Sequence, residues 1–179
     1  MRFKHAILGI LCFALAATVL AGAQEQDKSK RPSPPATAEA TINGKKITID
    51  YSRPSAKGRK VMGGVVPYGE VWRTGANEAT TLTTEGDINI GGTDVPAGKY
   101  TLYTFPSEGT WKLIINKQTG QWGTEYKEDQ DLARVDLRKS SLSKPVEQFL
   151  ISLKKKGANA ANLVLEWEKT RLSVVIKGK

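Results

Sequence analysis

The sequence has almost none of the two side chains on which most nucleophilic catalysis and soft-metal binding depend. Its 179 residues include one histidine and one cysteine, His5 and Cys12, both close to the N-terminus. Beyond them the chain cannot form a Ser-His-Asp triad, a Cys-His dyad or a thiolate metal site. Only oxygen-ligated Ca²⁺ or Mg²⁺ fits this composition, and the acidic run at 129–131 is too short for a calcium loop. We therefore predict no bound metal and no cofactor.

Long hydrophobic runs are also scarce, with one exception at the N-terminus. Two basic residues within the first five precede an apolar run over residues 6–20, and Ala21-Gly22-Ala23 then supplies small residues for cleavage. This order is typical of a secretory signal peptide, and the run is shorter than the roughly 20 residues of a membrane span. We predict that residues 1–23 are a signal peptide and that the mature protein is periplasmic or secreted, with no transmembrane segment.

The predicted mature chain has no cysteine, so its stability must come from a hydrophobic core rather than from disulfides. Residues 24–37 are polar and rich in proline, and a stretch of this composition does not pack a core. We predict a disordered tether over residues 24–37, followed by a single domain over residues 38–179.

The predicted domain shows the two-residue alternation of β-strands. Asn43-Gly44 is typical of a tight hairpin turn, and Ile47, Ile49 and Tyr51 alternate with polar residues behind it. Short strand-like runs continue to the C-terminus, the last two separated by Lys169-Thr170. They lie at 99–105, 111–115, 134–138, 149–153, 163–167 and 172–176. This pattern predicts an all-β fold, an antiparallel β-sandwich or jelly-roll-like single domain.

Two long segments lack the alternation and are predicted to be irregular loops. They cover residues 53–77 and 118–131. Long ordered loops on a β scaffold often carry binding residues, so their arginine, asparagine and aromatic side chains are the candidate ligand-binding residues. These are Arg53, Arg59, Tyr68, Trp72, Arg73, Asn77, Trp122 and Tyr126.

The three arginines of the first loop have two interpretations. Their guanidinium groups, with aromatic neighbours, could bind an anionic ligand. Alternatively they pair with Asp50, Glu70 and Glu78 and fix the loop. We favour this pairing, because buried ionic networks commonly serve structure. Replacing Arg73 would then leave a buried acid without its partner.

The tryptophans divide into two groups. Trp111 and Trp167 follow the strand alternation and are predicted to be core residues, whereas Trp122 lies in the second loop. Together with Tyr126, Trp122 could form a platform on which a sugar ring stacks. The other interpretation is a half-buried indole with its polar end in water.

Acidic residues near the loops raise the alternative of a hydrolase. Glu70, Glu78, Glu125 and Asp131 could supply the carboxylate pair of glycoside hydrolysis. No close spacing such as Glu-x-Asp-x-x-Glu marks any pair of them, so we favour a protein without catalytic residues.

The formal net charge is +9, and the basic residues are scattered along the chain. Clusters occur at 45–46, 57–60, 154–156 and 177–179. A nucleic-acid-binding protein would interleave aromatic residues on one basic face, so we predict no nucleic-acid partner. The charge permits weak attraction to anionic polymers of the cell envelope, or serves solubility alone.

Several segments resemble one bacterial protein family. They are residues 51–59, 63–77, 95–103, 115–117 and 121–126, and the most specific run is Pro-Tyr-Gly-Glu-Val-Trp-Arg-Thr-Gly-Ala-Asn at 67–77. Over residues 38–177 the chain is similar to the domain-of-unknown-function 2911 family. The resemblance implies an exported bacterial protein with a β-rich domain, and it implies no mechanism because the family's activity is unassigned.

These observations predict a non-catalytic module that binds a small anionic or sugar ligand, or an envelope glycan. The alternatives are a carboxylate-based hydrolase and a purely structural envelope protein. The three differ in whether Arg53, Trp72, Arg73 and Trp122 converge on an open cleft. A hydrolase would also need two acids in that cleft, about 5 to 9 Å apart.

Overall fold

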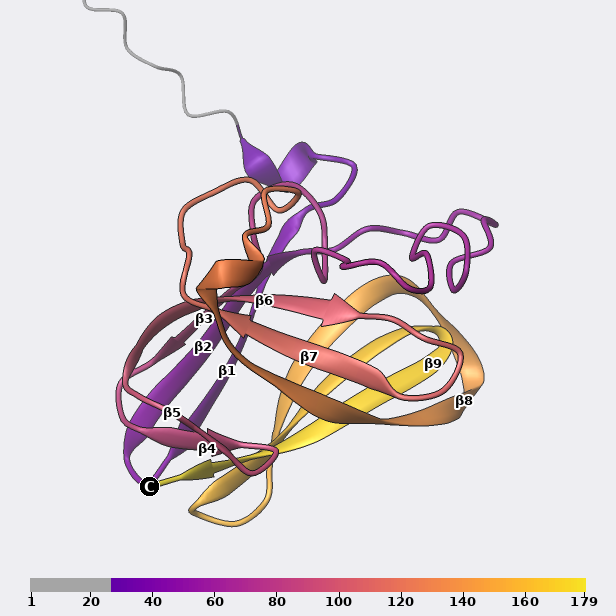
Figure 1. Cartoon of the computed structure of the whole chain (residues 1–179). Coiled ribbons are helices and arrows are strands. Elements are labelled where there is room, and N and C mark those ends of the chain that lie inside the picture. Colours follow the sequence, from indigo (N-terminus) through magenta and orange to yellow (C-terminus); the bar gives the residue numbers. More distant parts are fainter. Residues whose placement is uncertain (1–26) are drawn as a thin grey trace, which may run out of the picture.

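The computed structural model describes residues 27–179, and an antiparallel β-sheet dominates this part of the chain (Figure 1). Its nine strands follow the order β1-β2-β3-β6-β7-β8-β9-β4-β5. The described elements are η1 (Lys28–Lys30), β1 (Pro35–Ile42), β2 (Lys45–Ser52), β3 (Thr81–Thr84), β4 (Ile88–Ile90), β5 (Thr93–Val95), β6 (Gly98–Phe105), β7 (Trp111–Asn116), η2 (Glu128–Gln130), β8 (Asp131–Lys155) and β9 (Ala160–Gly178). The two helices are single 3₁₀ turns, so the prediction of an all-β antiparallel fold is confirmed.

The first hairpin forms as its sequence predicts. Asn43 and Gly44 have φ values of 50° and 73°, the positive values that a tight two-residue turn requires. β1 and β2 pair in register on either side of this turn. The alternation behind the turn places Ile47 and Ile49 in the core, where both side chains are fully buried.

The two longest strands differ from the expectation of short strands. The sequence predicted a break at Lys169-Thr170, yet β9 continues through it. Glu168 has a left-handed φ of 48°, and the register of β8 against β9 shifts between Ser141 and Leu150. Bulges of this kind bend a strand without ending it. Figure 1 shows the resulting curvature of β8 and β9.

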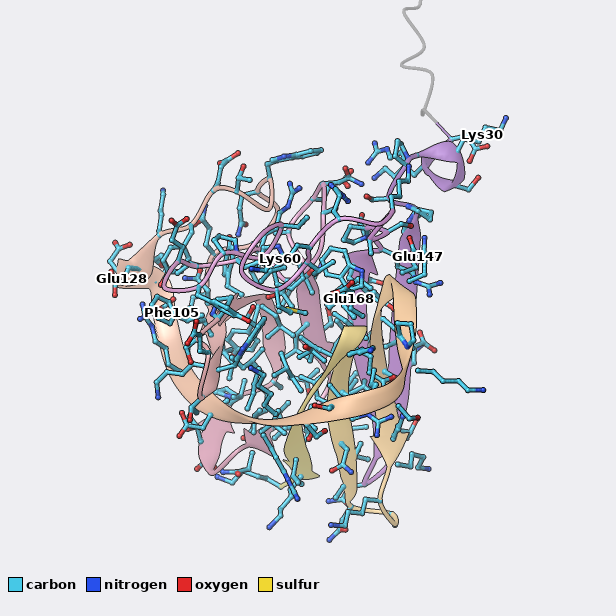
Figure 2. All side chains as sticks on the ribbon, turned by 90° about the vertical axis from the view of Figure 1, so that its right-hand side faces the viewer. Lys30, Lys60, Phe105, Glu128, Glu147 and Glu168 are labelled. Carbon is cyan, nitrogen blue, oxygen red and sulfur yellow. The ribbon has the colours of Figure 1, made fainter. Side chains whose placement is uncertain are left out.

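The bends let the sheet fold over and enclose the core. β8 pairs with β7 through residues 131–137 and with β9 through residues 138–155, so it belongs to both parts of the sheet. β1 lies close to β8 and β9 across the interior, and side chains fill the space between the two parts (Figure 2). Trp111 and Trp167 are each 1% exposed, which confirms the core prediction for both. The arrangement is consistent with the predicted β-sandwich.

The segment before β1 is bonded to the domain. The backbone N–H of Arg53 donates to Pro34 O at 2.9 Å, and Asn77 Nδ2 donates to Ser33 O at 2.9 Å. β1 itself begins inside the predicted tether. The expectation of a disordered tether is therefore corrected over residues 27–37. A polar, proline-rich stretch does not form a core of its own. Its carbonyl groups can still accept hydrogen bonds from the folded domain, here from the loop that follows β2.

The predicted signal peptide lies outside the described residues. Within residues 27–179, no helix is long and apolar enough to cross a membrane.

Candidate functional site

A pocket of about 410 Å³ opens where the two irregular loops meet. The loop between β2 and β3 and the loop between β7 and β8 supply most of its wall. The lining residues are Ser33, Pro54, Arg59, Val65, Pro67, Val71, Trp72, Arg73, Gly75, Ala76, Tyr103, Gly123, Thr124, Tyr126 and Trp167. The topology thus brings the two loops singled out from the sequence to one concave site.

The candidate residues divide evenly with respect to this pocket. Those that line it are Arg59, Trp72, Arg73 and Tyr126. Those outside its lining are Arg53, Tyr68, Asn77 and Trp122. Tyr103 and Trp167 line the pocket as well, although their sequence positions indicated only strand and core.

Aromatic side chains form one wall of the pocket. Trp72 and Trp167 stack with ring centroids 5.8 Å apart and 22° between their planes, and both line the pocket. Phe149 packs edge-on against Trp72 at 5.2 Å. Two backbone hydrogen bonds with Thr104 of β6, at 2.8 and 3.0 Å, hold Trp72 in place. Trp72 therefore anchors the first loop to the sheet.

Arg73 brings a positive charge to the pocket. Within residues 27–179 its guanidinium has no acidic partner, and burial lowers its pKa below the ordinary value of an arginine. Arginine remains charged at neutral pH despite such a change. Its side chain packs on Gly123, where an added Cβ would lie 3.0 Å from Arg73 Cδ.

The prediction that the loop arginines pair with nearby acids is wrong. Arg53 Nε donates to Phe149 O at 3.2 Å. Arg59 donates from Nε and Nη2 to the carbonyl oxygens of Ala56 and Ser55, at 3.0 and 2.6 Å. Arg59 thus closes a backbone turn within the loop, and Arg53 ties the start of the loop to β8.

Glu78, one of the expected partners, is occupied by the segment before β1. Arg31 Nη1 contacts both of its carboxylate oxygens, at 2.9 and 3.0 Å, and Lys28 Nζ lies 3.3 Å away. A hydrogen bond from the backbone N–H of Glu78, followed by those from Arg31 and Lys28, lowers the pKa of this carboxyl from 4.5 to about 2. The charged form of Glu78 therefore helps to hold the N-terminal segment beside the pocket.

This lowered pKa predicts an acid-dependent loss of stability. A carboxyl whose pKa is lower in the folded state stabilises the fold above its unfolded pKa and loses that contribution as the pH falls. The window runs from pH 4.5 down to about 2. Because the Glu78 side chain is 43% exposed, solvent screening reduces the contribution to about 1 kcal/mol.

Urea unfolding of the wild type and of Glu78→Gln, measured between pH 6 and 2.5, tests this expectation. The stability difference should be about 1 kcal/mol at pH 6 and should shrink towards zero at the acid end. Glu70→Gln, which removes an exposed acid with no side-chain bond in the described chain, controls for the lost charge. A Glu78 difference that stays constant with pH would contradict the assignment.

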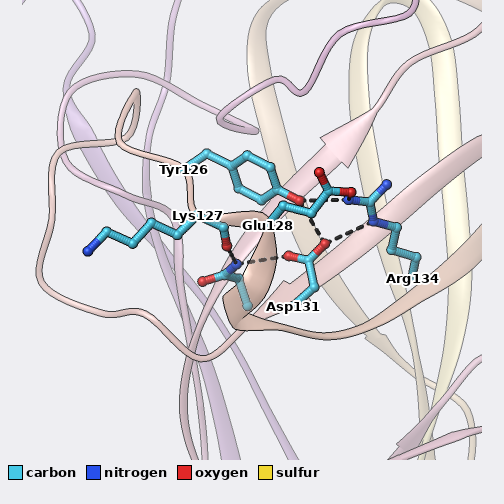
Figure 3. Close-up of polar contacts among 6 residues, drawn as sticks. Tyr126, Lys127, Glu128, Asp131 and Arg134 are labelled. Carbon is cyan, nitrogen blue, oxygen red and sulfur yellow. Dashed lines mark hydrogen bonds and ion pairs between the residues drawn. The ribbon is translucent and has the colours of Figure 1, made fainter.

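Asp131 organises the second loop beside the pocket (Figure 3). Its Oδ2 accepts hydrogen bonds from Tyr126 Oη at 2.7 Å and from Arg134 Nε at 2.9 Å. Its Oδ1 accepts one from Asn116 Nδ2 at 2.8 Å. Burial, followed by the bond to Asp131, raises the pKa of Tyr126 to about 12. Tyr126 is thus a neutral phenol fixed in one orientation, with its ring on the pocket.

Tyr103 supports the same wall from β6. Its ring meets that of Tyr126 at an angle of 68°, with centroids 5.0 Å apart. Its hydroxyl donates to Glu125 O at 2.7 Å and accepts from Gln121 Nε2 at 3.0 Å. Burial raises the pKa of Tyr103. Strand alternation could not reveal this role of Tyr103, because its partners lie in a loop 18 or more residues away in sequence.

Three other candidate residues, Asn77, Tyr68 and Trp122, lie outside the pocket lining. Asn77 has a left-handed φ of 59° and bonds through Nδ2 to Ser33, so its role is in the backbone turn. Tyr68 is partly buried against the core. Trp122 is 45% exposed, next to the lining residue Gly123, whose N–H donates to Asn77 O at 2.9 Å.

The acids considered for hydrolysis do not meet in this pocket. No aspartate or glutamate occurs among the described residues that line it. Glu78 bonds to Arg31, and Asp131 bonds to Tyr126 and Arg134. A group of three or more acidic, histidine or cysteine side chains able to hold a metal ion is likewise absent from residues 27–179.

Comparison with known proteins places the chain in a family. Residues 33–176 match the family model described as "Protein of unknown function (DUF2911)". No curated protein and no solved structure matches the chain. The match begins just before β1, ends two residues before the end of β9 and includes both loops of the pocket, so the segments noted in the sequence and the pocket all lie within the matched region, apart from Lys177. The chain belongs to the DUF2911 family of proteins of unknown function.

Proposed function

We propose that the protein is a non-catalytic binding module whose pocket takes a small anionic ligand with a sugar or other ring body. The observation that carries this proposal is Arg73, a charged guanidinium on a pocket that has no acid among its described lining residues. An arginine whose guanidinium has no hydrogen-bond partner among the described residues is suited to bind a carboxylate or phosphate with paired hydrogen bonds.

The other walls support the same class of ligand. Trp72 and Tyr126 offer aromatic surface and are supported by the buried rings of Trp167 and Tyr103, and Thr124 adds a hydroxyl group. Small-ligand sites typically combine apolar and aromatic walls with a few polar groups, in volumes of roughly 300–1,000 Å³. The pocket, at about 410 Å³, falls in this range.

The two alternatives receive less support. A glycoside hydrolase would need two carboxyl groups on either side of the scissile bond, and the pocket has none in its described lining. A purely structural role would not explain why Arg73, at an open pocket, has no acidic partner among residues 27–179. The predicted signal peptide would place this binding module outside the cytoplasm.

A matched pair of sugars tests the proposal directly. N-acetylmuramic acid differs from N-acetylglucosamine by a lactyl ether that carries a carboxylate. Because a ligand that binds only the folded state stabilises it by about 2.7 kcal/mol at 100 times its Kd, the acid should raise Tm by about 5–10 °C. N-acetylglucosamine should raise it much less. Uronic acids, aromatic carboxylates and peptidoglycan fragments extend the panel.

Arg73→Met should lower affinity for the acid at least tenfold, because it keeps an unbranched stem on Gly123 and removes the charge. Stability without ligand should change by less than about 1 kcal/mol, since no buried acid loses a partner. Titration calorimetry and unfolding curves measure the two effects. Arg53→Met is the control, because Arg53 bonds to a carbonyl outside the pocket.

Equal responses to the acid and the neutral sugar, or full binding by Arg73→Met, would contradict the proposal. Trp122→Ala tests whether the ligand extends beyond the pocket. If the ligand extends beyond the pocket, this variant should weaken binding of a peptidoglycan fragment and leave the monosaccharide acid unaffected, because Trp122 is exposed beside the lining.

A further inference from the structure

Three chain segments far apart in the sequence meet at the end of the domain away from the pocket loops (Figure 1). Asn43, at the tip of the β1–β2 hairpin, donates from its backbone N–H to Ala158 O in the β8–β9 hairpin at 3.0 Å. The N–H of Gly178, at the end of β9, donates to Asn159 O at 2.9 Å. The tertiary structure thus joins segments 43–46, 154–159 and 177–179.

These segments bring together basic clusters that are scattered in the sequence. Five of their lysines are exposed and form no ion pair with any described residue. They are Lys45, Lys154, Lys155, Lys156 and Lys177, here called the lysine end. Four acids lie beside these segments. Glu39 pairs with Lys46 at 2.7 Å and Asp94 pairs with Lys179 at 2.6 Å, while Glu85 and Asp87 accept hydrogen bonds from the backbone N–H groups of Lys46 and Ala97. The lysines of the three segments outnumber these acids, so the lysine end keeps a net positive charge.

We propose that the lysine end binds a flexible polymer with repeated phosphate or carboxylate groups. Its cations are all lysines, mobile point charges that do not impose the planar geometry of a guanidinium. They lie on two hairpin arms and a strand end, so a flexible chain can reach them in succession. Such binding releases counterions and rises steeply as salt is lowered.

A membrane surface fits the lysine end less well. Stable attachment to a bilayer needs an apolar or lipid anchor besides basic charge. The large hydrophobic side chains exposed in the described chain are Trp122 and Leu132, and neither belongs to the three segments. The binding surface is also separate from the pocket, so this proposal stands or falls independently of the ligand proposed above.

Two triple variants with the same loss of charge test the proposal. Lys154→Gln, Lys155→Gln and Lys156→Gln are combined in one. Lys127→Gln, Lys144→Gln and Lys169→Gln, exposed lysines outside the three segments, form the control. Binding to a fluorescent polyphosphate of defined length is measured by anisotropy at several salt concentrations. The first triple should lose about tenfold or more in affinity at low salt and show a shallower salt dependence, and the control should lose less than about twofold.

The remaining outcomes are decided by the same measurements. Equal losses in both triples would mean that only net charge matters and would overturn the proposal. So would tighter binding to phosphatidylglycerol vesicles than to polyphosphate of equal total charge. A DNA strand of equal charge that binds more tightly than polyphosphate would replace the proposed polymer with a nucleic acid. Circular dichroism shows whether each variant keeps its strand content.

Discussion

Trp167→Ala is expected to destabilise the domain by about 4 kcal/mol and to lower its Tm by roughly 10 °C. Trp167 is 1% exposed, stacks on Trp72 and packs against Phe149 at 5.8 Å. Its indole Nε1 also donates to Glu147 O at 3.0 Å. Truncation would leave a large cavity beneath the pocket and a carbonyl without its donor. Urea unfolding curves measure the loss.

Trp122→Ala is the matched control, because it removes the same side chain from an exposed position. Trp122 is 45% exposed, so its truncation should cost less than about 1 kcal/mol. Similar losses in the two variants would contradict the placement of Trp167 in the core. The Trp167 variant should also lose ligand response, because Trp72 would no longer have a stacked partner to hold it.

Asp131→Ala should destabilise the domain by about 2–3 kcal/mol, since three donors lose one acceptor residue. The side chain of Asp131 is 12% exposed, and it accepts from Asn116, Tyr126 and Arg134. Asn116 is fully buried, so water does not replace its lost bond. The pKa of Tyr126 should fall from about 12, although its burial keeps it above the ordinary value of about 10. Unfolding curves and ultraviolet titration of the phenol measure the two effects.

Glu128→Ala provides the comparison for Asp131. Glu128 accepts from the same arginine, Arg134 Nη2, at 2.7 Å, but its side chain is 76% exposed. Exposed ion pairs contribute little, so this variant should change stability by no more than about 0.5 kcal/mol. If Glu128→Ala were as costly as Asp131→Ala, the network would depend on the charge of Arg134 and not on the buried carboxylate.

Local patterns predicted the elements that depend on neighbours in sequence. The Asn43-Gly44 turn formed because positive φ values are accessible to those two residues wherever they occur. The alternation at 149–153 and 163–167 likewise predicted strand and core. The same patterns divided β9 at Lys169-Thr170, because a bulge and a turn both interrupt alternation and only strand pairing distinguishes them.

Side-chain partners could not be read from the same patterns. Arg73 was expected to pair with Glu70 or Glu78, which are close in sequence. Glu78 is instead bound by Arg31, 47 residues away, from a segment that was expected to be a disordered tether. An ion pair forms with whichever charge the fold brings within a few ångströms, and sequence distance carries little information about that.

The sequence by itself determined the all-β class, the tight hairpin, the burial of Trp111 and Trp167 and the two loops, because each follows from local conformational preference and from the two-residue alternation of a strand. Tertiary structure alone decided that those loops meet at a pocket, that Arg73 has no acidic partner in the described chain, and that lysines from three segments share one end. These features depend on bends in β8 and β9 and on the pairing of distant strands. Packing between residues far apart in sequence sets this geometry, and the alternation of apolar and polar residues along a strand does not encode it.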